Sequence, residues 1–136
     1  MSQKLTSKEI APIIVRIGMS LVFLWFASQQ FMNVDMWTRL IPASITDMTG
    51  LSAATLVYFN ASFETVFGLC LLAGFFTRTC AVLLALHLLS ISVNLGYGAV
   101  AVRDIGLMFA TFAVAFYGAD RWCVDSRLKG RAMPNA

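Results

Sequence analysis

Residues 52–97 read SAATLVYFNASFETVFGLCLLAGFFTRTCAVLLALHLLSISVNLGY. This stretch contains two apolar runs, 52–76 and 79–97, and each is close to the length of about 20 residues that a helix needs to cross a bilayer. Backbone groups in lipid must find hydrogen-bond partners within their own segment, so both runs are expected to be helices. Only residues 76–78 connect them, which predicts an antiparallel helical hairpin.

Two further apolar runs flank this hairpin, at 11–32 and 104–119. Of the 136 residues, 59% are hydrophobic and only 12% are charged, and the mean hydropathy is +0.77. A water-soluble domain has about a quarter of its residues charged, and a chain this short could not bury so much apolar surface. The sequence therefore predicts an all-α fold, a four-transmembrane-helix antiparallel bundle in which residues 1–136 form a single membrane domain.

The connections and the basic residues predict how the bundle is oriented. Residues 33–51 form the one long connection, for which we expect a short amphipathic segment in the membrane interface, anchored by Trp37. Only Arg39 and Arg103 lie on the side of this loop, whereas Lys and Arg concentrate on the cytoplasmic side of membrane proteins. The opposite side carries Lys4, Lys8, Arg78, Arg121, Arg127, Lys129 and Arg131. We therefore expect both N and C termini to be cytoplasmic.

Polar residues inside the spans are costly in lipid and so mark candidate functional positions. A rise of about 1.5 Å per residue places Glu64 and His87 near the middle of their spans. Asn60 and Glu64 are four residues apart and share a helix face, and His87 and Asn94 share another. If these faces point inward, they enclose a polar cavity open toward the outside, where Glu64 meets His87 or Arg103.

We interpret Glu64 and His87 as the candidate catalytic residues, acting through hydrogen bonds or proton transfer. Each polar residue also has a purely structural interpretation. Arg16 would then extend toward cytoplasmic head groups, the amides would join helices, and Glu64 would be a buried structural acid. The candidate ligand-binding residues are Arg16, Gln30, Asn60, Asn94, Arg103 and Asp104.

Several classes of site are excluded by residue counts. The single histidine, His87, rules out bis-histidine haem ligation and histidine-rich metal centres, so we expect no haem or metal. Cys70, Cys80 and Cys123 form no CxxC pair, which argues against a zinc site or a disulfide framework. There is no phosphate-binding glycine loop or nucleophile elbow, and the charge is not distributed as in a nucleic-acid-binding protein.

Six short motifs, taken together and in order, resemble the DoxX family of bacterial four-helix integral membrane proteins. They are RIG at 16–18, LWFASQQ at 24–30, ETVFG at 64–68, GFFTRTCA at 74–81, RDIGL at 103–107 and GADRWCVD at 118–125. The resemblance covers about residues 10–125. It implies a multi-pass protein of the bacterial plasma (inner) membrane, with functional positions at Arg16, Glu64, Arg103 and Asp104.

The resemblance also implies a functional class. Some family members are small membrane subunits of thiosulfate:quinone oxidoreductase, and others belong to membrane redox complexes with superoxide dismutase and a sulfurtransferase. The chain departs from the family pattern at Ala27, Gln30 and Cys123, where Gly, Lys and Ser are common. Losing that Lys puts a shared anion-binding role in doubt, and a thiol at position 123 is not expected to be essential.

Our leading hypothesis is a redox-associated subunit, the membrane subunit of an oxidoreductase complex, that binds a quinone or similar apolar ligand inside the bundle. The bilayer and a redox partner protein are then its expected partners, and a homo-oligomer stays open. The alternative is a non-catalytic membrane scaffold or assembly partner. A small-solute or lipid carrier ranks third, because alternating access usually needs more spans or an internal repeat.

Overall fold

The computed structural model describes residues 6–131, with side chains described as far as residue 128, and this part of the chain is entirely helical apart from turns. Four helices are long and apolar enough to cross a membrane, which confirms the predicted all-α fold with four spans. They are α1 (Ser7–Met32), α4 (Ala53–Ala73), α5 (Thr77–Leu95) and α6 (Ala99–Tyr117). Three short helices complete the fold: α2 (Val34–Thr38), α3 (Ala43–Thr49) and α7 (Val124–Arg131).

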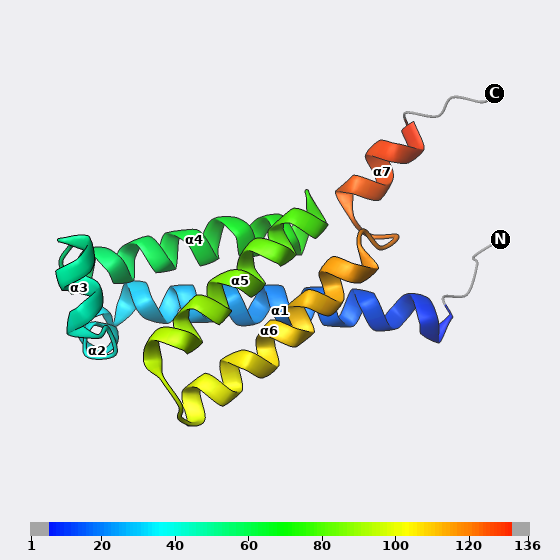
Figure 1. The fold of residues 1–136 in the computed structure, drawn as a ribbon. Helices are drawn as coiled ribbons and strands as arrows, with labels where there is room; N and C mark the ends of the chain where they lie inside the picture. The colour runs from blue at the N-terminus through cyan, green and yellow to red at the C-terminus, as the bar shows by residue number, and fades with distance from the viewer. Residues whose placement is uncertain (1–5, 132–136) are drawn as a thin grey trace.

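The four spans run antiparallel to their neighbours in sequence (Figure 1). The start of α1, the α4–α5 turn and α7 lie together at one end of the bundle, here called the α7 end. Helices α2 and α3 and the α5–α6 turn lie at the opposite end, here called the α3 end. Helix α1 packs mainly on α4, and α5 packs mainly on α6, so the bundle consists of two helix pairs.

The basic residues from which the orientation was predicted separate between the two ends of the bundle, as far as the structure describes them. Lys8, Arg78, Arg121 and Arg127 lie at the α7 end, and Arg39 and Arg103 lie toward the α3 end. Lys4 lies outside the described residues, and Lys129 and Arg131 are described only as backbone of α7. The structure carries no membrane, so which end faces the cytoplasm stays a prediction from the Lys and Arg distribution.

A tight turn between α4 and α5 brings the segment after α6 against it. Gly74 ends α4 with a φ of +72°, a left-handed conformation that glycine adopts without steric cost. The carboxylate of Asp125 accepts hydrogen bonds from the backbone N–H groups of Phe76 and Thr77, at 2.9 and 2.8 Å. It thereby satisfies donors that the first turn of α5 leaves unpaired. The buried Cys123 packs directly against Gly74.

The apolar core occupies the middle of the bundle and its α7 half. Its fully buried members include Phe23 on α1, Leu71 on α4 and Leu84 on α5, with Met108 and Val114 from α6 packed against them. Large apolar side chains also cover the outside of the spans, as expected for surfaces that contact lipid tails rather than water. Toward the α3 end the core borders a cavity, and core residues Phe23 and Leu88 form part of its wall.

The connection 33–51 is helical in two short pieces, and its place in the membrane interface stays a prediction. It forms α2 and α3, neither of which has a buried residue, and it folds across the α3 end of the bundle. Helix α6 also begins earlier than expected, at Ala99 rather than at residue 104. Arg103 and Asp104 consequently lie one turn inside the helix, where they face neighbouring side chains instead of forming its first residues.

Candidate functional site

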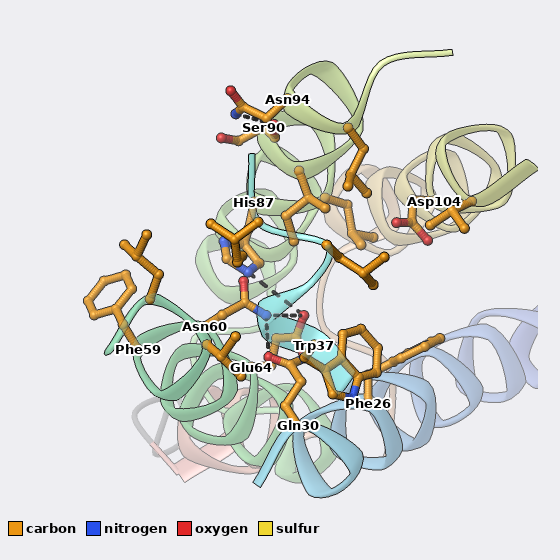
Figure 2. A pocket seen from close by; sticks show the side chains of 18 of the residues that line it. Phe26, Gln30, Trp37, Phe59, Asn60, Glu64, His87, Ser90, Asn94 and Asp104 are labelled. Atoms are coloured by element: carbon orange, nitrogen blue, oxygen red, sulfur yellow. Dashed lines mark hydrogen bonds and ion pairs between the residues drawn. The ribbon is translucent and has the colours of Figure 1, made fainter. Parts of the chain in front are cut away.

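A cavity of about 380 Å³ lies at the α3 end, enclosed by the four spans and covered by the α2–α3 segment. Its walls are mostly apolar, with contributions from Val22 and Phe23 on α1, Leu88 on α5 and Leu107 on α6. Polar side chains are concentrated on one side, where α1, α4 and α5 meet (Figure 2). This composition, an apolar hollow with a few convergent polar groups, is typical of small-molecule sites.

Three polar side chains link α1 to α4 inside this cavity. Gln30 on α1 donates from Nε2 to Oε2 of Glu64 at 2.8 Å, and the side-chain amide of Asn60 donates to Gln30 Oε1 at 2.6 Å. The same Asn60 nitrogen lies 3.3 Å from Oε1 of Glu64. The buried carboxyl of Glu64 is therefore held between two amides, which orients Oε1 toward α5.

His87 on α5 faces this carboxyl group. Its Nε2 lies 3.7 Å from Glu64 Oε1, which is too long for a hydrogen bond, and its ring stacks on Phe63 with centroids 4.6 Å apart. Nε2 is buried and has no hydrogen-bond partner among the described residues. Since a buried polar atom without a partner is costly, this nitrogen is a site that a ligand could satisfy.

On the opposite wall, Arg103 and Asp104 form an ion pair between consecutive residues of α6. Arg103 Nη2 lies 2.8 Å from Asp104 Oδ1, and the guanidinium sits over the ring of Phe26 on α1, 4.7 Å from its centroid. Asp104 is buried, whereas about half of the Arg103 side chain is exposed. This arrangement joins α1 to α6 through a cation–π contact and leaves Arg103 apart from Glu64.

Trp37 is a cavity residue that the sequence reasoning placed elsewhere. Instead of anchoring the loop in the interface, its indole lines the cavity and makes an edge-to-face contact with Phe26, with centroids 6.0 Å apart. Its Nε1 is buried without a hydrogen-bond partner among the described residues, like His87 Nε2. The sequence signal that could have identified it is an aromatic residue in a loop too apolar to be fully solvated.

Of the two remaining candidates, Asn94 lies at the cavity margin and Arg16 lies at the α7 end. Asn94 lies on the margin, where it is exposed and its amide donates to the carbonyl of Ser90 at 2.7 Å. Arg16 does not line the cavity, and it does not extend to head groups either, because its side chain is only 2% exposed. Its guanidinium binds Asp120 at the α7 end.

The structure thus brings together seven of the eight predicted site residues around one cavity. The seven are Gln30, Asn60, Glu64, His87, Asn94, Arg103 and Asp104. Within the described part of the chain, no three His, Cys, Asp or Glu side chains gather closely enough to hold a metal ion.

Comparison with known families matches the DoxX family model to residues 11–95, which is more than half of the chain. The chain belongs to the DoxX family. The matched DoxX segment runs from the first turns of α1 to the end of α5, so it contains Gln30, Asn60, Glu64 and His87. No curated protein and no solved structure matches the chain significantly.

In this DoxX protein, Gln30 occupies the position where the family resemblance led us to expect Lys. An ammonium group there would only donate hydrogen bonds, whereas the amide of Gln30 donates to Glu64 and also accepts from Asn60. The amide therefore connects both α4 residues without adding a positive charge to the cavity. Consequently Glu64 has no lysine or arginine in ion-pair distance among the described residues.

Proposed function

We propose that this DoxX protein is a redox-associated subunit of the bacterial inner membrane that binds a quinone in the cavity at the α3 end. Both termini would face the cytoplasm, as the distribution of Lys and Arg predicts, so the cavity would lie in the outer half of the bilayer. The family membership and the four membrane-spanning helices support a membrane role. The choice of ligand rests on the chemistry of the cavity.

The observation that carries the proposal is the unpartnered Nε2 of His87 facing Glu64 Oε1 across 3.7 Å. A bound quinone supplies two-electron redox chemistry through a ring that has oxygen atoms at opposite ends. An imidazole nitrogen can donate a hydrogen bond to a carbonyl oxygen or accept one from a hydroxyl, depending on its tautomer. His87 is therefore suited to hold either form of the ring, and Glu64, 3.7 Å from His87 Nε2, would exchange a proton with His87 through one bridging water.

The rest of the cavity supports an apolar ring. Its volume of about 380 Å³ falls within the range of about 300–1,000 Å³ that is usual for small-molecule sites. Phe26 and Trp37 offer aromatic faces, and Trp37 Nε1 provides a second donor without a partner among the described residues. A redox partner protein would complete the reaction by delivering or removing the electrons.

Purification in a mild detergent, followed by mass spectrometry of bound small molecules and an absorption spectrum, tests the proposal. We expect quinone to copurify with the wild type and with Asp35→Asn, which removes an exposed acid outside the cavity. Glu64→Gln should retain the fold but lose the quinone. The proposal fails if the wild type is empty and does not bind added quinone, or if Glu64→Gln binds it normally.

A second candidate, a non-catalytic scaffold or assembly partner, is favoured by the hydrogen bonds that Gln30, Asn60 and Glu64 already make with each other. In that case these residues serve to join α1 and α4. The purified protein would then be empty, and removing the Glu64 carboxyl would lower stability without affecting any ligand.

A further inference from the structure

The cavity reaches the membrane-facing surface between α4 and α5. Phe59 on α4 lines the cavity and is 66% exposed, and Ser90 and Asn94 on α5 line it and are exposed as well. Figure 2 shows these three side chains at the margin, with Asn60, Glu64 and His87 further inside. Both helices are long and apolar enough to span a membrane, so we expect the opening at the level of Phe59 and Ser90 to face the bilayer.

The neighbouring sides of the cavity are closed by contacts between helices. Between α1 and α4, the hydrogen bond from Gln30 to Glu64 crosses the interface. Between α1 and α6, the guanidinium of Arg103 covers Phe26. Helices α5 and α6 pack closely along their length. Between α4 and α5, His87 contacts Phe63 and Glu64, but one turn nearer the α3 end, at the level of Phe59, the described residues form no such bridge. The two helices diverge from their tight turn at the α7 end (Figure 1).

A row of aromatic rings runs along α4 from this opening toward the α7 end, and of its three members only Phe59 lines the cavity. Phe59, Phe63 and Phe67 are spaced four residues apart, with centroid separations of 6.4 Å for the outer pair and 4.5 Å for the inner pair. Phe63 in turn stacks on His87. Because Phe59 and His87 line the same cavity, an apolar chain that lies against Phe59 could extend from lipid to a ring held at His87 Nε2.

We infer that the ligand is a membrane-dissolved quinone with a long apolar tail, and that it enters from the bilayer between α4 and α5. In the bound state its ring lies beside His87, and its tail extends past Phe59 and Ser90. This inference rests on the proposed function and specifies its substrate class. It makes Ser90 a specificity-determining position, since a small side chain there keeps the opening wide.

Ser90→Phe tests the inference, with Val93→Phe as the matched control on the same helix. Val93 is 72% exposed and does not line the cavity, and neither substitution changes the number of tryptophans. Each protein is reconstituted in nanodiscs and titrated with ubiquinone bearing a decyl tail and with the same ring without a tail. Quenching of tryptophan fluorescence gives the dissociation constant, and a size-exclusion profile checks the fold.

We expect Ser90→Phe to weaken binding of the tailed quinone by about ten-fold or more, equivalent to about 1.4 kcal/mol, and to change binding of the bare ring by less than about two-fold. Val93→Phe should change neither. Equal weakening of both ligands, or no effect on either, would overturn the route while leaving the site intact. Failure of the wild type to bind either quinone would overturn the proposed function as well.

Discussion

The guanidinium of Arg16 donates from Nε to Oδ2 of Asp120 across 2.6 Å, although 104 positions separate the two residues. Their side chains are only 2% and 3% exposed. The Nη1 of the same guanidinium donates to the backbone carbonyls of Leu71 and Leu72 in the last turn of α4, where the Leu71 carbonyl also accepts from the Gly74 N–H at 3.1 Å. One side chain of α1 thus joins the end of α4 to the segment between α6 and α7.

Replacing Arg16 with Gln should strongly destabilise the protein, because it leaves the buried carboxylate of Asp120 without its cation. Breaking a buried pair in this way typically costs about 3–5 kcal/mol. The measurement is the melting temperature in detergent, followed by fluorescence-detected size exclusion. Arg121→Gln is the control, since the pair of Arg121 with Glu9 is exposed and its loss should leave the melting temperature unchanged.

The double variant Arg16→Met/Asp120→Leu checks the cause. It removes both charges together, so it should be more stable than Arg16→Gln if an uncompensated charge is responsible. Equal destabilisation in the two variants would instead assign the loss to packing and to the lost hydrogen bonds from Arg16 to the α4 carbonyls.

The pair also predicts a dependence of stability on pH. Burial alone would raise the pKa of the Asp120 carboxyl, but hydrogen bonds from Arg16 and from the Trp122 N–H outweigh burial and lower this pKa below its usual value. The folded state therefore binds a proton less readily than the unfolded state, and stability falls as the pH falls.

We expect the melting temperature to be insensitive to this group at neutral pH and to decline below about pH 4, near the usual Asp value. The decline should be shallower in Asp120→Asn, which has no carboxyl group to protonate. A series of melting curves from pH 7 to pH 3 measures it. Identical pH profiles in the two proteins would refute the assignment to Asp120.

His87→Phe separates ligand binding from folding. The new ring can still stack on Phe63, and the lost Nε2 makes no hydrogen bond with the described residues, so stability should change by less than about 1 kcal/mol. Under the proposed function, quinone affinity should fall by about three- to ten-fold or more, the equivalent of one hydrogen bond. Leu86→Phe, on the lipid-facing side of the same helix, is the control. Unchanged affinity in His87→Phe would remove His87 from the site.

Gly74→Ala should loosen the contact between the α4–α5 turn and the segment after α6. A Cβ there would lie 2.5 Å from both Cα and Sγ of Cys123, and the φ of +72° is unfavourable for alanine. We expect a loss of about 1–3 kcal/mol in the free energy of unfolding. Gly18→Ala, with no atom within 4 Å of the added carbon, should be tolerated. Equal stability of the two variants in denaturant titrations would contradict this reading of the turn.

Features that depend on neighbours in sequence could be predicted. The four spans followed from hydropathy, and the spacing of Asn60 and Glu64 placed both on one face of α4, where the structure shows them 3.3 Å apart. The similar depth of His87 and Glu64 made His87 one of two predicted neighbours of Glu64, and the structure places them 3.7 Å apart. The rise per residue of a helix converts a position within a span into a depth in the membrane, so the depth of each polar group can be calculated from the sequence of its own span.

Features that depend on how helices rotate against each other could not be predicted. Depth alone left Glu64 with either His87 or Arg103, and the side-chain packing of α1 against α6 assigned Arg103 to Phe26 instead. The partner of Arg16 lies on a segment beyond the last span, where hydropathy carries no information. The sequence did not predict that Trp37 lines the cavity, because an aromatic residue in an apolar loop is equally compatible with the membrane interface and with the cover of a cavity.

The ion pair of Arg16 with Asp120 and the hydrogen bonds that Asp125 accepts all lie at the α7 end, whereas the cavity lies at the α3 end. The contacts at the α7 end are therefore separate from the cavity, although Gln30 and Glu64 also join α1 to α4 within it. Substitutions at cavity positions that join no helices, such as Ser90, should therefore change the cavity while leaving the contacts at the α7 end in place. An engineer could therefore vary such cavity positions at the α3 end and keep the ion pair and hydrogen bonds at the α7 end unchanged.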